Sequence, residues 1–365
     1  MSDAKVRVLI VDDSQIVRSI LRASLSSHPR IEIVGMACDG NEALQKISAL
    51  KPDVVTLDVE MPNLNGIQLL ERIGGKLPVG FVMCSTLTQA GASITLEALR
   101  KGALDYVAKP TNGAFAGNAE FRAELHAKVL AAAAGRERVR NLVRSNASGA
   151  ARSAAPTLPP NRERGWVVAI GVSCGGPQTL HELLPAFPSD FVPIVVTQHM
   201  PAQFTKSFAQ HLNDACSMKV REAVDNERLE QGTILVAPGS AHLRIVRLGC
   251  DLFTRLDPGP KVSGHRPSVD AMFDSLADSA RERCVGVVLT GMGNDGAQGV
   301  IALNRVNAWT VAQDEATSLV YGMPKAAAQT GKIDRVAPLN QIPITVSKLL
   351  QSGVRRAAPA AAAVH

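Results

Sequence analysis

Short apolar runs that end in charged residues recur through the first third of the chain, and they limit its fold more than any other feature. Runs of this kind are typical of buried strands in a parallel sheet. The runs and the charged residues after them are Val6–Val11 with Asp12 and Asp13, residues 54–57 with Asp58, and residues 106–108 with Lys109. Because α/β sheets bind ligands at the carboxyl ends of their strands, we expect these four side chains to meet at one edge.

Three carboxylates and one lysine at one sheet edge would form a divalent-metal site beside a phosphoryl acceptor. Mg²⁺ prefers hard oxygen ligands, and lysine can neutralise charge on a transferred phosphoryl group. Each residue also has an ordinary structural explanation, since Asp13 before Ser14 could cap a helix and Asp58 could cap a turn. Because all of the spacings fit one pattern, we favour the metal and phosphoryl site.

Residues 5–125 resemble the receiver domain of two-component response regulators. The motifs that carry the resemblance are Asp58-x-x-Met61-Pro62-x-x-Asn65-Gly66 and Lys109-Pro110. The resemblance implies a flavodoxin-like parallel sheet and a histidine kinase as phosphodonor for Asp58. It implies that Mg²⁺ is bound by Asp12, Asp13, Asp58 and the main-chain carbonyl of Glu60. It also implies Ser85 as the switch hydroxyl, Tyr106 as the switch aromatic and Lys109 as the phosphate partner.

A length of 365 residues is sufficient for two domains with complete cores. No apolar stretch reaches the roughly 18 to 20 residues of a membrane-spanning helix. The N-terminus leads directly into a predicted strand and shows no signal peptide. The six cysteines are scattered singly, which argues against metal fingers and disulfide frameworks. We therefore expect a cytoplasmic protein with no direct membrane insertion.

The formal net charge of +6 is concentrated in residues 136–164, which hold seven arginines and two glutamates. Such a stretch can bind nucleic acid or an acidic protein surface, but it is more often a solvated linker. We expect a linker, and no nucleic-acid partner. The predicted divisions are a receiver domain at 5–125, a helix extension and flexible basic linker at 126–164, a second domain at 165–353 and a disordered tail at 354–365. The helix is expected from about residue 115 to 144, and the flexible linker follows it.

The second domain alternates strand-like and helix-like segments, which favours a second doubly wound α/β sheet. Strands are predicted at residues 166–170, 193–197, 233–237, 284–289 and 309–312. Helices are predicted near residues 177–184, 203–213, 268–281, 296–305 and 324–330. Residues 239–256 contain two short β-like runs, at 243–246 and 252–254, and therefore indicate a β-hairpin excursion.

Three polar residues of the second domain follow predicted strands, namely Ser173, His199 and Asp295. A serine on a tight strand-to-helix turn presents its hydroxyl at the sheet edge, near the N–H groups of the helix. Because serine alone is a weak nucleophile, it needs a base such as His199, oriented by a buried carboxylate such as Asp295. The pattern favours a hydrolase with a Ser-His-Asp triad.

The same residues could instead have purely structural roles or belong to a nucleotide site. Ser173 could lie in a plain turn, His199 could be structural, and Asp295 could cap a helix. Residues 171–176 are also one substitution from the dinucleotide-binding pattern G-x-G-x-x-G. Serine replaces the middle glycine, however, and Gln198 with His199 stands where a ribose-binding acidic residue is expected. The triad accounts for both departures, so we favour it over a nucleotide site.

With the first domain, the second half resembles the chemotaxis response regulators that are protein-glutamate methylesterases/glutaminases. The motifs are IGVSCGGP at 170–177, QHM at 198–200, APG at 237–239, HRPSVD at 265–270, LTGMGNDG at 289–296 and YGMP at 321–324. The resemblance implies demethylation of glutamate γ-methyl esters, and deamidation of certain glutamines, on methyl-accepting chemotaxis receptors, with no cofactor for the ester step. It implies Ser173 as nucleophile, His199 as proton carrier and Asp295 as orienting carboxylate. The main-chain N–H groups of Cys174 and Met292 are the candidates for the oxyanion hole.

Cys174 departs from the family pattern, which usually has threonine after the nucleophile. A role for the main-chain N–H survives this difference, but a hydroxyl hydrogen bond to the histidine would be lost. A thiol is also intrinsically more reactive than a hydroxyl. We favour Ser173 as the nucleophile because it occupies the elbow position.

A receiver joined to a hydrolase suggests that phosphorylation controls access to the active site. We expect the unphosphorylated receiver to cover the Ser173 edge, and phosphorylation of Asp58 to release it.

A transcription regulator would instead carry a helix-turn-helix with a basic face, which strand–helix alternation does not indicate. A non-catalytic adaptor would bind receptors and leave their ester content unchanged. Nothing in the sequence demands more than a monomer.

Overall fold

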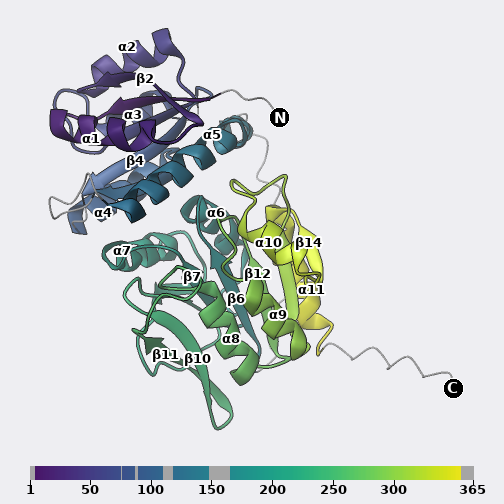
Figure 1. The fold of residues 1–365 in the computed structure, drawn as a ribbon. Coiled ribbons are helices and arrows are strands. Elements are labelled where there is room, and N and C mark those ends of the chain that lie inside the picture. The colour runs from purple at the N-terminus through teal and green to yellow at the C-terminus, as the bar shows by residue number, and fades with distance from the viewer. Residues whose placement is uncertain (1–4, 75, 87–88, 110–117, 148–164, 355–365) are drawn as a thin grey trace. The chain divides into compact units, whose positions relative to one another are not determined.

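The computed structural model describes residues 5–74, 76–86, 89–109, 118–147 and 165–354. They divide into two compact units, Met1–Ser153 and Ala154–His365, each with its own parallel sheet (Figure 1). The predicted flexible linker and tail fall mainly on residues 148–164 and 355–365, which lie outside the described residues.

The first unit is a five-stranded parallel sheet in the order β2-β1-β3-β4-β5, which confirms the predicted flavodoxin-like fold. Its elements are β1 (Val6–Val11), α1 (Gln15–Ser26), β2 (Ile31–Ala37), α2 (Gly40–Leu50), β3 (Val54–Asp58), α3 (Gly66–Ile73), β4 (Gly80–Thr86), α4 (Gln89–Arg100), β5 (Asp105–Lys109) and α5 (Ala119–Ala147). The side chains of Ser14, Asp39 and Asn65 cap the first three helices by accepting hydrogen bonds from their N-terminal N–H groups. Polar residues directly after buried strands are therefore held at the carboxyl edge of the sheet.

The second unit is a seven-stranded parallel sheet in the order β14-β13-β12-β6-β7-β9-β8, which confirms the doubly wound prediction. Its strands are β6 (Val167–Val172), β7 (Ile194–Gln198), β8 (Lys219–Glu222), β9 (Thr233–Val236), β12 (Cys284–Val288), β13 (Trp309–Gln313) and β14 (Arg335–Ala337). Its α-helices are α6 (Gly176–Leu183), α7 (Ala202–Asn213), α8 (Val269–Ser279), α9 (Ala297–Arg305), α10 (Met323–Gln329) and α11 (Ile342–Gln351). The three strands that precede the predicted triad residues, β12, β6 and β7, are neighbours in the sheet.

The predicted hairpin is present as the antiparallel pair β10 (His242–Leu248) and β11 (Asp251–Asp257). One face of the hairpin is apolar and packs into the core of the unit through Leu243, Ile245 and Leu252. The hydroxyl of Ser275 on α8 accepts a hydrogen bond from the N–H of Ile245 at 2.9 Å and donates to the carbonyl of Met272 on its own helix. The hairpin therefore supports α8, the helix that begins beside Asp295.

Two strands and one α-helix of the second unit were not predicted by the sequence patterns: β8, β14 and α11. The two strands are the outer edges of the sheet, only four and three residues long, and they are partly exposed. Short edge strands show neither a long apolar run nor clear alternation, which explains their omission. No helix within the described residues is long and apolar enough to cross a membrane.

Candidate active site and phosphoacceptor site

The turn after β6 presents Ser173 at the carboxyl edge of the sheet. The N–H of Ser173 donates to the carbonyl of Thr290 at 3.0 Å, and its own carbonyl accepts from the N–H of Gly176 at 2.8 Å. Gly175 has a φ of 73°, and a Cβ there would lie 2.5 Å from Leu319. Glycine is required at this point because an L side chain is disfavoured in the left-handed region and would collide here.

The glycines of the pattern at 171–176 contact protein side chains. A Cβ on Gly171 would lie 2.2 Å from Val269 of α8, and one on Gly176 would lie 1.9 Å from Oε1 of Gln198. Close packing inside the fold therefore explains both glycines without a bound pyrophosphate. This geometry removes the main reason for expecting a dinucleotide at this turn.

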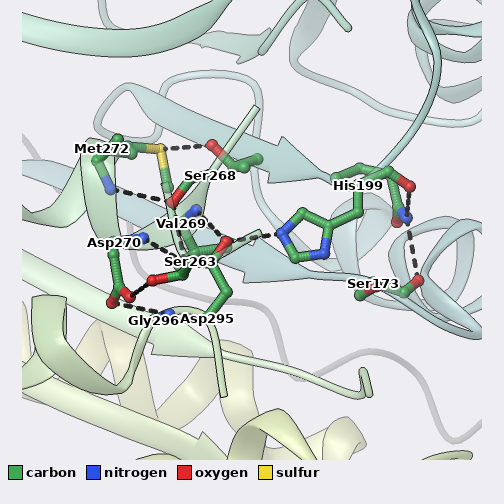
Figure 2. A network of polar contacts seen from close by, with 12 residues as sticks. Ser173, His199, Ser263, Ser268, Val269, Asp270, Met272, Asp295 and Gly296 are labelled. Carbon is green, nitrogen blue, oxygen red and sulfur yellow. Dashed lines mark hydrogen bonds and ion pairs between the residues drawn. The ribbon is translucent and has the colours of Figure 1, made fainter. Parts of the chain in front are cut away.

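Asp295 is completely buried and accepts four hydrogen bonds (Figure 2). Its Oδ1 accepts from the hydroxyl of Ser268 and the N–H of Asp270, each at 2.9 Å. Its Oδ2 accepts from the N–H of Val269 and from Nε2 of His199, each at 2.8 Å. The two N–H groups are the first of α8, so the carboxylate sits where the helix dipole favours a negative charge.

These contacts decide the charge of Asp295 and the tautomer of His199. Burial opposes ionisation of Asp295, but the hydrogen bond and charge of His199, with the N–H groups of Asp270 and Val269, outweigh it and lower its pKa. An ionised carboxylate can only accept, so Nε2 of His199 must carry the proton. Nδ1 is then the basic nitrogen, and it is buried with no hydrogen-bond partner among the described residues.

Asp270 supports the same arrangement from the other side. Its Oδ1 accepts from the N–H groups of Gly296 and Gly299, each at 2.8 Å, at the start of α9, and its Oδ2 accepts from the hydroxyl of Ser263 at 2.6 Å. Burial raises the pKa of Asp270, and the nearby charge of Asp295 adds to this increase. Asp295 therefore caps the helix that contains Asp270, and Asp270 caps the helix that follows Asp295, which fixes the position of both carboxylates.

His265 lies flat against His199. The two ring centroids are 3.7 Å apart and the rings are nearly parallel, with an angle of 7° between them. Our sequence reasoning did not assign a role to His265, Ser268 or Asp270, although all three lie in the segment HRPSVD at 265–270. The helix near residues 268–281 was predicted, and a serine before an apolar helical run is an N-cap signal, but this signal does not reveal the contact between Ser268 and Asp295.

The segment after β12 lies against the nucleophile turn. A Cβ on Gly291 would lie 2.8 Å from Cβ of Ser173, so the turn that contains Met292 is in contact with the serine. The main-chain N–H of Met292 makes no hydrogen bond to any described residue, and 45% of this residue is exposed. Cys174 is buried, and its carbonyl accepts from the hydroxyl of Thr290 at 3.0 Å. The geometry is compatible with Met292 as an oxyanion donor.

The structure brings the predicted acidic residues of the first unit together with Lys109. Carboxylate oxygens of Asp12, Asp13 and Asp58 lie within 4.8 Å of one another. Nζ of Lys109 is 2.7 Å from Oδ2 of Asp12 and 2.8 Å from Oδ2 of Asp58. Asp13 is exposed, whereas the other three side chains are buried. Glu60, the source of the further predicted carbonyl ligand, borders a cavity of about 560 Å³ together with Asp13.

One lysine is shared between two carboxylates. Burial therefore outweighs the ion pair at Asp58, whereas the two carboxylates outweigh burial at Lys109. Burial raises the pKa of Asp58 to about 6 despite Lys109, and the charge of Asp12 contributes to the increase. Burial would lower the pKa of Lys109, but Asp58 and Asp12 together raise it. The lysine therefore stays charged, while ionisation of Asp58 remains costly until another cation arrives.

The predicted switch residues Ser85 and Tyr106 lie on β4 and β5, which are paired strands, and both are buried. Lys128 of α5 donates to the carbonyl of Tyr106 at 2.6 Å, and its Nζ lies 4.6 Å from the centre of the Tyr106 ring. Tyr106 is therefore packed inward against α5 in this structure.

Two protein families match the chain in succession. The response regulator receiver domain matches residues 8–114, and the CheB methylesterase domain matches residues 168–346. A relative from Caulobacter vibrioides, named protein-glutamate methylesterase/protein-glutamine glutaminase 1, is 49% identical over 345 residues, which cover 93% of this chain and 96% of the relative. A relative of the same activity name from Sulfurimonas denitrificans is 43% identical and covers 94% of this chain and 98% of its own length.

A solved structure supports the assignment of the second unit. The crystal structure of the Thermotoga maritima CheB methylesterase catalytic domain has a TM-score of 0.50 and 38% sequence identity, and it covers 51% of this chain and 100% of that domain. The curated relatives match over nearly the whole chain, across both domains. This chain therefore belongs to the protein-glutamate methylesterase/protein-glutamine glutaminase family, in which a receiver domain precedes a CheB methylesterase domain.

Proposed function

We propose that this chain is a phosphorylation-activated hydrolase that demethylates glutamate γ-methyl esters, and deamidates specific glutamines, on methyl-accepting chemotaxis receptors. The observation that carries the proposal is the state of His199. Its Nε2 is committed to a buried, ionised Asp295, and its buried Nδ1 has no partner within the described residues. The hydroxyl of Ser173 makes no hydrogen bond to a described residue either, so a base and a nucleophile are both available.

Acylation would proceed through Ser173. Its Oγ attacks the ester carbonyl carbon while Nδ1 of His199 takes the hydroxyl proton. The positive charge that develops on the imidazole is balanced by Asp295, which already accepts the Nε2 proton at 2.8 Å. The N–H groups of Met292 and Cys174 would stabilise the oxyanion. Collapse of the tetrahedral intermediate breaks the ester C–O bond, and His199 returns the proton to the departing methanol.

Deacylation would repeat these steps with water as the nucleophile. His199 takes a proton from the water, the oxygen adds to the acyl carbon, and Ser173 leaves with the proton, which releases the glutamate carboxyl group. A glutamine substrate would follow the same route, with ammonia in place of methanol. Both reactions need only the serine, the histidine and a fixed carboxylate, with no cofactor for the hydrolytic step.

Activation would occur at the carboxyl edge of the sheet in the first unit. Asp58 attacks the phosphorus of a phosphohistidine on a histidine kinase, so that a P–O bond forms while the P–N bond breaks. The cluster of Asp12, Asp13 and Asp58 fits Mg²⁺, because three carboxylates lie within 4.8 Å and one of them is exposed. Mg²⁺ bound there, with the carbonyl of Glu60, would neutralise charge on the phosphoryl group. Lys109 would contact the phosphoryl oxygens, and Ser85 and Tyr106 would rearrange around them.

Receptors of this kind present their methylated helices in the cytoplasm, where the histidine kinase also acts. The enzyme is therefore expected there as a monomer, without membrane insertion. The near-neutral charge of the second unit supports the expectation that nucleic acid is not a partner.

Methanol release from radiolabelled, methylated receptor membranes tests the proposal directly. Wild type, Ser173→Ala and Cys174→Ala are compared with and without Mg²⁺ and a small-molecule phosphodonor. We expect release that rises with the phosphodonor, disappears in Ser173→Ala and persists in Cys174→Ala. Release that depends on Cys174 instead would assign the chemistry to the thiol. No release from wild type, with unimpaired receptor binding, would favour a non-catalytic adaptor.

A further inference from the structure

Gln198 connects the two predicted catalytic residues through their main chains. It is the last residue of β7, and only 3% of it is exposed. Its Nε2 donates to the carbonyl of Ser173 at 3.0 Å and to the carbonyl of His199 at 3.1 Å. The pairing of β6 with β7 ends at Val172 and Gln198, so these two carbonyls lie just beyond the regular ladder. The side-chain amide joins the strands where the backbone no longer does.

The arrangement requires two N–H donors on one side chain. Both hydrogens of Nε2 are used, and reversing the amide would place its oxygen against two carbonyl oxygens. Oε1 is buried, has no hydrogen-bond partner among the described residues, and lies where a Cβ on Gly176 would be only 1.9 Å away. A buried polar atom without a partner is unfavourable. The two donated bonds therefore hold the amide in this orientation even though Oε1 has no partner among the described residues.

The bond to Ser173 also fixes the peptide that follows it. Peptide bonds that precede residues other than proline are trans with very few exceptions. In a trans peptide the C=O and the N–H of the next residue point in opposite directions. With the C=O of Ser173 held by Gln198, the N–H of Cys174 is directed away from Gln198. The bond from the N–H of Gly176 to the same carbonyl keeps the plane in that orientation.

We infer that Gln198 is a positioning residue for the oxyanion hole: it holds the Ser173–Cys174 peptide so that the N–H of Cys174 faces the reacting carbonyl. This inference rests on the proposed function, because it assumes acyl transfer at Ser173. The second bond, to the carbonyl of His199, keeps the base at a constant distance from the same peptide. The amide of Gln198 touches neither substrate nor proton, so it acts only through these main-chain groups.

Two substitutions of similar size separate the hydrogen bonds from the packing. Gln198→Met keeps the length of the side chain and removes both donors, and Gln198→Glu replaces them with a group that repels both carbonyls. Gln231→Met is the control for loss of a glutamine donor elsewhere in the unit, because Nε2 of the exposed Gln231 also donates to a main-chain carbonyl, that of Asp190, before β9. Steady-state methanol release and the rate at which a fluorophosphonate probe labels Ser173 are measured on the full-length proteins.

For Gln198→Met we expect kcat to fall by about 10²–10³, the usual effect of losing one oxyanion donor, while KM changes by less than about threefold. Labelling by the fluorophosphonate should slow to a similar degree, because its P=O group needs the same donors. The pH midpoint of kcat/KM should not move, since the hydrogen bond between Nε2 of His199 and Asp295 is retained. Gln198→Glu should be at least as impaired, and Gln231→Met should match wild type in all three measurements.

Three results would overturn the inference. The first is a kcat and a labelling rate within about threefold of wild type in Gln198→Met. The second is a displaced pH midpoint, which would show that Gln198 acts through the base and not through the oxyanion donor. The third is an equal loss in Gln231→Met, which would reveal general loosening. If wild type released no methanol, the proposed substrate would be wrong, and the labelling rates would still decide the role of Gln198.

Discussion

Asp58→Asn should stabilise the first unit at neutral pH, because the native fold holds Asp58 beside another carboxylate and out of water. Burial raises the pKa of Asp58 from 3.8 to about 6. A carboxyl group with a raised pKa binds protons more tightly in the native state, so its ionisation lowers stability as the pH rises from about 4 to about 6. The cost above that range is about 3 kcal/mol, and asparagine avoids it.

The chain allows this effect to be measured in one unit with the other as an internal control. Both tryptophans, Trp166 and Trp309, lie in the second unit, so tryptophan fluorescence reports that unit alone. Amide hydrogen exchange of peptides from β1, β3 and β4, read by mass spectrometry without Mg²⁺, reports the first. We expect the exchange of Asp58→Asn to slow by roughly 10²-fold at pH 8, corresponding to about 3 kcal/mol, with unchanged tryptophan fluorescence.

The dependence on pH is the decisive part of this test. The advantage of Asp58→Asn over wild type should shrink steadily below pH 6 and almost vanish near pH 4, after correction for intrinsic exchange. A constant difference at every pH would mean that the substitution acts through packing or through Lys109. A lower stability of the variant at pH 8 would refute the conclusion that ionised Asp58 is held at a cost.

Three further predictions concern the hydrolytic site and the metal. Asp295→Asn should reduce kcat by about 10³–10⁴, because an amide places its NH₂ group against either a helix N–H or Nε2 of His199; methanol release with intact circular dichroism checks this. Ser268→Ala removes one of the four hydrogen bonds to Asp295 and the cap of α8. It should lower the free energy of urea unfolding by about 1 kcal/mol and kcat by about tenfold. A loss of kcat as large as that of Asp295→Asn would contradict the conclusion that four hydrogen bonds share the support of Asp295. Chelation of Mg²⁺ should abolish stimulation by a phosphodonor but leave basal release unchanged, whereas a loss of basal release would place a metal at the ester site.

The sequence patterns located most of the fold because parallel strands covered on both faces are long, apolar and bounded by polar residues. This is why β6, β7, β12 and β13 could be predicted to within one or two residues. The edge strands β8 and β14 failed the same test, since a strand such as Lys219–Glu222 has charged side chains at all but one of its positions. Helix α11 was also overlooked, although Pro343 near its start is a helix-initiation signal.

For the candidate site, the sequence predicted which residues follow the strand ends, but not the contacts between their side chains. That Ser173, His199 and Asp295 lie on adjacent strands follows from sheet topology, which the alternation of elements indicates. Which ring nitrogen acts as the base does not follow, because it depends on the direction from which Asp295 approaches His199. The support from Gln198 was equally hidden, because it depends on where the ladder between β6 and β7 ends.

Two aspartates at the carboxyl edges of two parallel sheets have their pKa values moved in opposite directions, and the cause lies in what surrounds each one. Asp58 shares a single lysine with Asp12, and burial raises its pKa to about 6. Asp295 meets the first N–H groups of α8 and an imidazole N–H, and its pKa is lowered despite complete burial.

Each direction suits the proposed task. A carboxylate that is ionised at neutral pH yet retains some basicity is the better nucleophile toward phosphorus, and cations that arrive with the phosphoryl group relieve the cost of its burial. An orienting carboxylate must remain charged while the histidine beside it gains and loses a proton, so a lowered pKa is required of Asp295. In the proposed function the same residue type would therefore serve as a phosphoacceptor in one unit and as a fixed anion in the other, because a crowded acidic cluster surrounds the first and a helix N-terminus surrounds the second.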